Sequence, residues 1–128
     1  MYFKDLSTVS EKPSQELITV GWLDSQHPFS KGVSDEAFLD ALFRACLTPL
    51  NPTRGFHRCE FCRPSRNEAV IAERGGEKIY LGNAEIRIPH GDGRFFAAPN
   101  LIFHYVEQHS YLPPLEFVRS VRQQQRQL

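Results

Sequence analysis

Two cysteines and two histidines most constrain what this chain can fold into, because a shared metal ion would join two distant segments. The cysteines form the motif Cys59-x-x-Cys62, and His104 and His109 follow after the 41 residues from 63 to 103. Two thiolates at this spacing reach one tetrahedral ion when the backbone between them turns, and zinc sites combine such a pair with further ligands. The sequence therefore predicts a zinc ion bound by Cys59, Cys62, His104 and His109.

The separation between the two pairs predicts a cross-brace rather than a free-standing zinc finger. A metal clip across a long loop restricts the unfolded chain, and structural zinc contributes on the order of 10 kcal/mol in small peptides. We therefore expect zinc to matter more for folding than for chemistry. The imidazoles of His104 and His109 are rotated by about 140° on a regular helix. Both reach one ion only if the helix end loosens, as a helix ending before Pro113 can do.

Other interpretations of these residues stay open. His57, two residues before the cysteine pair, and His90, in a Gly-Asp-Gly loop, compete with His109 for the fourth ligand position. The cysteine pair is also compatible with two reduced thiols in a turn. Redox activity is disfavoured, because a thioredoxin-type pair sits at the start of a helix after a strand, whereas Pro64 closely follows this pair.

The third cysteine and a further histidine have structural interpretations. Cys46 lies on the apolar face of a predicted helix, so we expect an inert thiol in the core. His27 follows Asp24 by three residues. We expect a local hydrogen bond between these two side chains in preference to an exposed binding role for His27.

Apolar periodicity predicts short strands and about three helices. A buried strand is expected over 16–23, and a helix over 34–47 with Ser34 as its N-cap. Two further helices are expected to begin near Pro99 and near Pro114. Between the cysteine pair and these helices, glycine-rich turns separate four strand-like runs, 68–73, 77–81, 84–88 and 94–97. The last two runs are expected to form a hairpin.

This order of elements predicts an α+β fold with a small antiparallel sheet, about three helices and a zinc-knuckle cross-brace. The chain has 128 residues, which is room for a single domain over 1–128. Apolar residues make up 41% of the chain and include ten Phe, so there is enough bulk for a buried core.

The charge balance disfavours nucleic acid as a partner. Fifteen Lys and Arg cancel fifteen Asp and Glu, which removes the long-range attraction to phosphate that nucleic-acid binders show. The same neutrality disfavours a nuclease built around His90 and Asp92. A local basic group near the end of the chain, which we interpret as a solvated helix face, contains Arg119, Arg122 and Arg126.

The sequence contains no targeting or membrane-spanning signal. No run approaches the ~20 consecutive apolar residues of a membrane span, and the first residues lack the basic and apolar regions of a signal peptide. The Cys-x-x-Cys spacing is also more typical of metal or redox chemistry in a reducing compartment than of a disulfide framework. We therefore expect a cytoplasmic protein with no membrane partner, and the sequence leaves its oligomeric state open.

No catalytic motif accompanies the predicted metal ligands. A catalytic zinc keeps an open position beside a carboxylate, and the candidate bases are Glu60, Glu85 and Glu107. The chain has no His-Glu-x-x-His, Gly-x-Ser-x-Gly, phosphate-binding glycine loop or deaminase motif. The sequence favours a macromolecule-binding or regulatory module, with a protein as its partner. The alternative is a zinc-dependent hydrolase or nuclease with three protein ligands and water.

Several sequence blocks combine into a signature: Tyr2-Phe3-Lys4-Asp5-Leu6-Ser7, Gly55-Phe56-His57-x-Cys59-x-x-Cys62 and His104-Tyr105-Val106-x-x-His109. With these blocks the chain resembles a family of short uncharacterised bacterial proteins. The resemblance covers most of the chain and is weakest over 64–81. It implies a cytoplasmic origin and a common design for the cysteine and histidine motifs, and it implies no activity and no ligand set.

Overall fold

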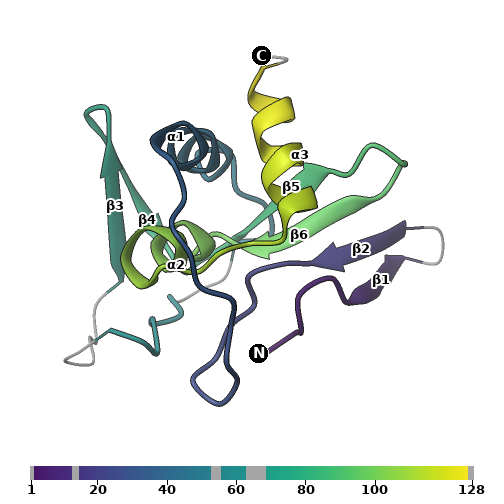
Figure 1. Ribbon diagram of the computed structural model, residues 1–128, viewed down its shortest axis with the longest axis horizontal. Coiled ribbons are helices and arrows are strands. Elements are labelled where there is room, and N and C mark those ends of the chain that lie inside the picture. The colour runs from purple at the N-terminus through teal and green to yellow at the C-terminus, as the bar shows by residue number, and fades with distance from the viewer. Residues whose placement is uncertain (1, 13–14, 53–55, 63–68, 127–128) are drawn as a thin grey trace.

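The computed structural model describes residues 2–12, 15–52, 56–62 and 69–126, and leaves the side chains of 11–12 and 125–126 undescribed. Figure 1 labels its helices and strands. In chain order they are β1 Thr8–Lys12, β2 Gln15–Thr19, α1 Glu36–Ala45, β3 Val70–Arg74, β4 Glu77–Leu81, β5 Glu85–Pro89, β6 Phe95–Pro99, α2 Ile102–His109 and α3 Leu115–Arg126.

The strands form a main sheet of order β1-β2-β6-β5 and a separate hairpin, β3-β4. β2 and β6 run parallel, with Ile18 opposite Phe96, whereas the other neighbouring strands run antiparallel. The predicted α+β class with three helices is confirmed, and the main sheet is mixed rather than antiparallel. A parallel pair needs a long crossover, and here α1 and the β3-β4 hairpin lie between the two strands in the chain.

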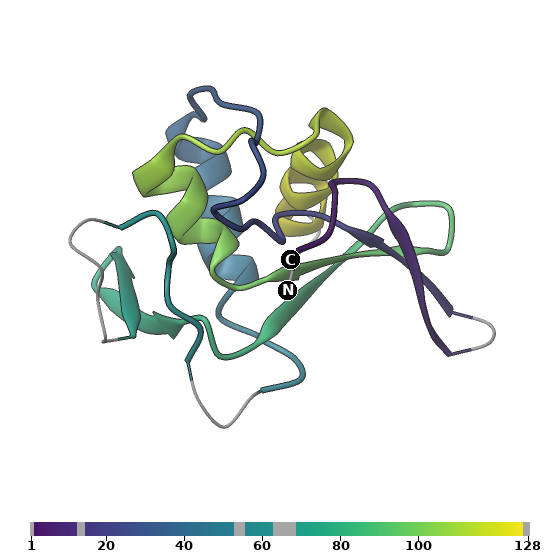
Figure 2. The ribbon, with the colours of Figure 1, turned by 90° about the horizontal axis from the view of Figure 1, so that it is seen from below.

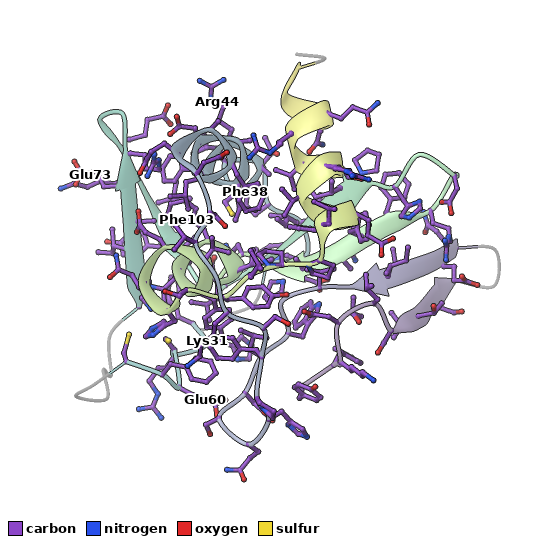
Figure 3. The ribbon with its side chains drawn as sticks, viewed as in Figure 1. Lys31, Phe38, Arg44, Glu60, Glu73 and Phe103 are labelled. Carbon is purple, nitrogen blue, oxygen red and sulfur yellow. The ribbon has the colours of Figure 1, made fainter. Side chains whose placement is uncertain are left out.

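All three helices lie on one face of the main sheet, as Figure 2 shows. Alternation along the strands turns Ile18, Ile88 and Phe96 toward this face, where each is at most 5% exposed. Phe96 meets Phe117 of α3 edge to face, with ring centroids 5.5 Å apart. In Figure 3, Phe38 of α1 points into the same interior. The core therefore lies between the sheet and the helices.

The N-cap of α1 is Asp35, so the prediction of Ser34 was wrong by one residue. The Asp35 carboxylate accepts a hydrogen bond from the Phe38 backbone N–H at 2.8 Å. It also accepts from the Arg122 guanidinium of α3 at 2.7 Å, and this bond is the main reason that the pKa of Asp35 lies below its usual value. One member of the basic group near the end of the chain therefore joins α3 to α1.

The strand predicted over 16–23 ends at Thr19, four residues early. Gly21 has a φ of +79°, and a Cβ there would lie 2.7 Å from Cδ1 of Ile102. The Gly21 N–H donates to the Asp5 carboxylate at 3.0 Å, and the Tyr111 hydroxyl donates to the same carboxylate at 2.7 Å. These contacts, which link segments far apart in the chain, turn the backbone out of the sheet.

The other strand and helix predictions are confirmed with small shifts. The four strand-like runs correspond to β3, β4, β5 and β6, with Glu68 outside the described residues, and β5 and β6 form the expected hairpin. Pro99 ends β6 instead of beginning a helix, and α2 begins at Ile102. β1 was not predicted, because Val9 is the one apolar residue among its five.

A membrane-spanning helix is absent from the described part of the chain, where every helix is too short or too polar to cross a bilayer.

Candidate metal centre

The four predicted ligands lie together between the cysteine knuckle, defined here as residues 56–62, and the end of α2. Their donor atoms all lie within 4.8 Å of one another. Nε2 of His109 lies 3.3 Å from Sγ of Cys59, 3.6 Å from Sγ of Cys62 and 3.2 Å from Nε2 of His104. Sγ of Cys62 lies 3.2 Å from Nε2 of His104. This cluster could hold a metal ion.

These four of the six donor–donor distances are close to the edges of a tetrahedron around one ion. Zinc bonds of ~2.3 Å to sulfur and ~2.0 Å to nitrogen at tetrahedral angles place neighbouring donors roughly 3.3 to 3.8 Å apart. The four distances given above run from 3.2 to 3.6 Å. The cluster is therefore compact enough to hold one small cation.

The end of α2 loosens in the way that the spacing of the two histidines requires. Ser110 follows the helix in the left-handed region, with a φ of +57°, and its N–H donates to the Tyr105 carbonyl. The Tyr111 N–H donates to the same carbonyl at 3.1 Å. Both bonds span more residues than the regular helical bond between residues four apart. The last turn of the helix is therefore wider, and His109 can face His104.

Backbone contacts position the knuckle against the turn after β4. The His57 N–H donates to the Gly82 carbonyl at 2.7 Å. Gly82 has a φ of +92°, and a Cβ there would overlap the His57 carbonyl oxygen. The Gly82 N–H donates to the side chain of Asn100, which is 1% exposed, at 2.7 Å. Gly82 and Asn100 thus hold the knuckle in place, and neither was predicted, because their roles depend on contacts between distant segments.

The tip of the knuckle is attached to a second loop. The Glu60 carboxylate accepts hydrogen bonds from the Ser25 N–H at 3.1 Å and from the Ser25 hydroxyl at 2.8 Å. Figure 3 shows Glu60 beside this loop. Phe61 packs on the ring of His109, with centroids 5.7 Å apart, and its N–H donates to Sγ of Cys59 at 3.4 Å. Such an N–H bond favours the thiolate form that a metal needs.

Burial sets the protonation of the cluster in the absence of an ion. Burial raises the pKa of the Cys59 thiol to about 11, and it lowers the pKa of His109. Burial also raises the pKa of Tyr105, with a further contribution from Cys59. The pKa shifts of Cys59 and His109 both favour the uncharged form of the donor. A cation that binds here must therefore displace the thiol protons, and its positive charge then stabilises the thiolates.

The two alternative histidines lie outside the cluster. The side chain of His57 is exposed although its backbone pairs with Gly82. His90 lies 3.1 Å from the Asp92 carboxylate and 3.5 Å from that of Glu116, at the hairpin between β5 and β6. Neither belongs to the group of donors around the cysteine pair.

The candidate catalytic carboxylates have other partners. The Glu60 carboxylate accepts a hydrogen bond from the Ser25 N–H. The Glu85 carboxylate pairs with the Arg87 guanidinium at 2.7 Å. Glu107 lies 3.6 Å from the guanidinium of Arg74. All three carboxylates are therefore engaged in contacts that do not involve the cluster.

The structural interpretations of Cys46 and His27 are confirmed. Cys46 is 2% exposed, and burial raises the pKa of its thiol to about 12, which disfavours the reactive thiolate form. Nδ1 of His27 lies 2.7 Å from the Asp24 carboxylate, and the His27 ring stacks on Tyr2 with centroids 3.8 Å apart.

The fold and the cluster together define a small α+β protein with a Cys2His2 group suited to a metal ion. Residues 1–122 match the family described as "Domain of unknown function (DUF7919)", and the chain belongs to this family. Neither the curated proteins nor the solved structures contain a match to the chain.

Proposed function

We propose that this protein is a zinc-stabilised module that binds another protein, with the ion holding the knuckle against α2. The observation that carries the metal part is the cluster of four protein donors within 4.8 Å of one another, Cys59, Cys62, His104 and His109. Four protein ligands complete the coordination of zinc and leave no position for water, which is typical of structural sites. Two sulfur and two imidazole donors also suit zinc better than they suit magnesium or calcium.

An exposed apolar patch supports the protein-binding part of the proposal. Ile71 and Tyr80 face each other across the β3-β4 hairpin, and Phe56 of the knuckle lies 5.7 Å from the Tyr80 ring. Their exposed fractions are 54%, 59% and 46%. Exposed apolar groups gathered in this way mark contact surfaces. The balanced net charge favours a protein over a nucleic acid as the partner.

We expect the protein to act in the cytoplasm of a bacterial cell. Its three cysteines are all unpaired, and Cys59 and Cys62 can serve as ligands only when they are reduced. A reducing compartment would keep them so.

A metal-dependent hydrolase is the second candidate, and one cavity favours it. A cavity of about 390 Å³ is lined by Cys62, His104, His109 and Glu107, so a substrate could approach the cluster from this side. Such an enzyme would need one of the four donors to leave the ion and water to replace it.

Cobalt substitution tests the coordination. We expect the cobalt-loaded protein to show the intense visible absorption of a tetrahedral site, together with sulfur-to-metal charge transfer from two thiolates, and no exchangeable water. The Cys46→Ala variant, which changes the cysteine outside the cluster, should give the same spectrum. A spectrum that indicates three protein ligands and an exchangeable water would contradict the structural proposal and favour the hydrolase.

Charged substitutions in the patch test partner binding. We expect Tyr80→Lys to reduce the capture of partner proteins from a lysate of the source cell by at least about tenfold, because it places a charge in the apolar contact. Leu115→Lys is the matched control, since Leu115 is 62% exposed on α3, outside the patch. Equal capture by both variants would show that the patch is not the contact surface.

A further inference from the structure

The face of the main sheet opposite the helices contains a second cavity, of about 470 Å³. Leu17, Thr19 and Ala97 line it, and they alternate along β2 and β6 with the residues that face the helices. The knuckle forms another part of its lining through Arg58 and Glu60. This volume lies within the range of small-molecule sites.

Aromatic side chains give this cavity flat apolar surfaces. Phe3 and Trp22 meet edge to face, with ring centroids 5.8 Å apart, and both line the cavity. The indole N–H of Trp22 donates to the Ala97 carbonyl at 2.9 Å, which holds its ring in place. Preformed surfaces of this kind favour a planar aromatic ligand, because aromatic rings stack and pack edge to face.

The charged groups around the cavity balance one another and already have partners. Arg87 pairs with Glu85 at 2.7 Å, and Glu60 accepts two hydrogen bonds from Ser25. Arg58 is also engaged in an interaction. A charged ligand would have to break one of these pairs to find a counter-ion, so the cavity favours a ligand without net charge.

A nearly buried tyrosine contributes a hydroxyl to the lining. Tyr105 is 5% exposed and lines the cavity, and its hydroxyl makes no hydrogen bond to any residue that the structure describes. A hydroxyl in a cavity wall can donate and accept hydrogen bonds, so it can bond to a molecule in the cavity. A polar atom of a bound molecule would supply the partner.

We propose that this cavity binds an uncharged, planar aromatic small molecule that hydrogen-bonds to the Tyr105 hydroxyl. The aromatic walls, the paired charges and the hydroxyl of Tyr105 all favour this class of ligand. The site is separate from the four metal donors and from the apolar patch on the hairpin.

A titration of the purified protein with 2-naphthol tests the proposal, with naphthalene-2-sulfonate as the charged analogue. Trp22 is the only tryptophan of the chain, so its indole N–H gives one recognisable resonance in a ¹H–¹⁵N spectrum. We expect 2-naphthol to shift this resonance and to saturate below millimolar concentration, and the sulfonate to bind at least about tenfold more weakly. Tyr105→Phe should weaken 2-naphthol binding by about five- to tenfold, which corresponds to one hydrogen bond.

The matched control is Tyr80→Phe, which removes the same hydroxyl from a tyrosine outside the cavity and should leave binding unchanged. Three results would overturn the proposal. They are the absence of a saturable shift at Trp22, a sulfonate that binds as tightly as 2-naphthol, and equal binding by the Tyr105→Phe variant and the wild type.

Discussion

Removal of the metal by a chelator is expected to cost the protein about 4 kcal/mol or more of unfolding free energy and to lower its Tm by roughly 15 °C. Without an ion, the described polar contacts that hold the knuckle include the bond from His57 to Gly82 and those from Ser25 to Glu60. A bound ion would add bonds between two segments that 41 residues separate in the chain. Thermal unfolding with and without chelator, together with elemental analysis, measures the effect.

Substitution of a single metal donor should reproduce this loss of stability, whereas substitution of a cysteine or histidine outside the cluster should not. We expect Cys59→Ser and His104→Ala to contain less than one zinc per chain and to unfold at lower temperature. Cys46→Ala and His90→Ala are the matched controls, and both should keep the full metal content. If Cys59→Ser and His104→Ala both retain stoichiometric zinc and wild-type stability, the ligand assignment is wrong.

The metal should also be lost as the pH falls. Cys59 must be a thiolate and His109 a neutral imidazole to bind the ion, so protons compete with the metal for both groups. Burial raises the pKa of Cys59 to about 11 in the absence of an ion, so binding releases a proton even near neutral pH. Burial lowers the pKa of His109, so this imidazole is already neutral there. The apparent zinc affinity is therefore expected to rise with pH through the neutral range, and a pH-independent affinity would contradict thiolate ligation.

The second large effect is expected for Gly82→Ala, with a loss of about 3 kcal/mol or more of unfolding free energy and weaker metal binding. The φ of +92° at Gly82 is itself strained for alanine, at about 1 to 2 kcal/mol. The new Cβ would also overlap the His57 carbonyl oxygen, which belongs to the backbone and cannot rotate away. The knuckle must then shift, and Cys59 shifts with it. Denaturant titration measures the stability, and competition with a chromophoric chelator measures the zinc affinity.

Gly76→Ala is the matched control for this substitution. Gly76 has a φ of +85°, close to that of Gly82, but no atom lies within 4 Å of the position of its added Cβ. This variant should lose about 1 to 2 kcal/mol through backbone strain alone and should bind zinc as the wild type does. If both variants lose the same stability and neither changes the zinc affinity, the contact with the knuckle does not position the metal site.

Local patterns predicted the elements whose apolar faces follow a regular period. α1 and α3 were recognisable from helical spacing, and β4 from its apolar and aromatic content between glycine turns. Boundaries failed where a distant contact overrides the pattern. β2 stops before Gly21 because Ile102 and Asp5 lie there, and both are remote in the sequence.

The cysteine and histidine spacing alone determined which side chains have donor atoms suited to zinc, because ligand chemistry and spacing are properties of short segments. It left open which of His57, His90 and His109 would join the group. Only the tertiary structure decided that His109 meets the other donors and that Gly82, Asn100 and Tyr105 surround the knuckle. These positions depend on how the strands between the two motifs pack, and no local pattern encodes the distance between residues so far apart.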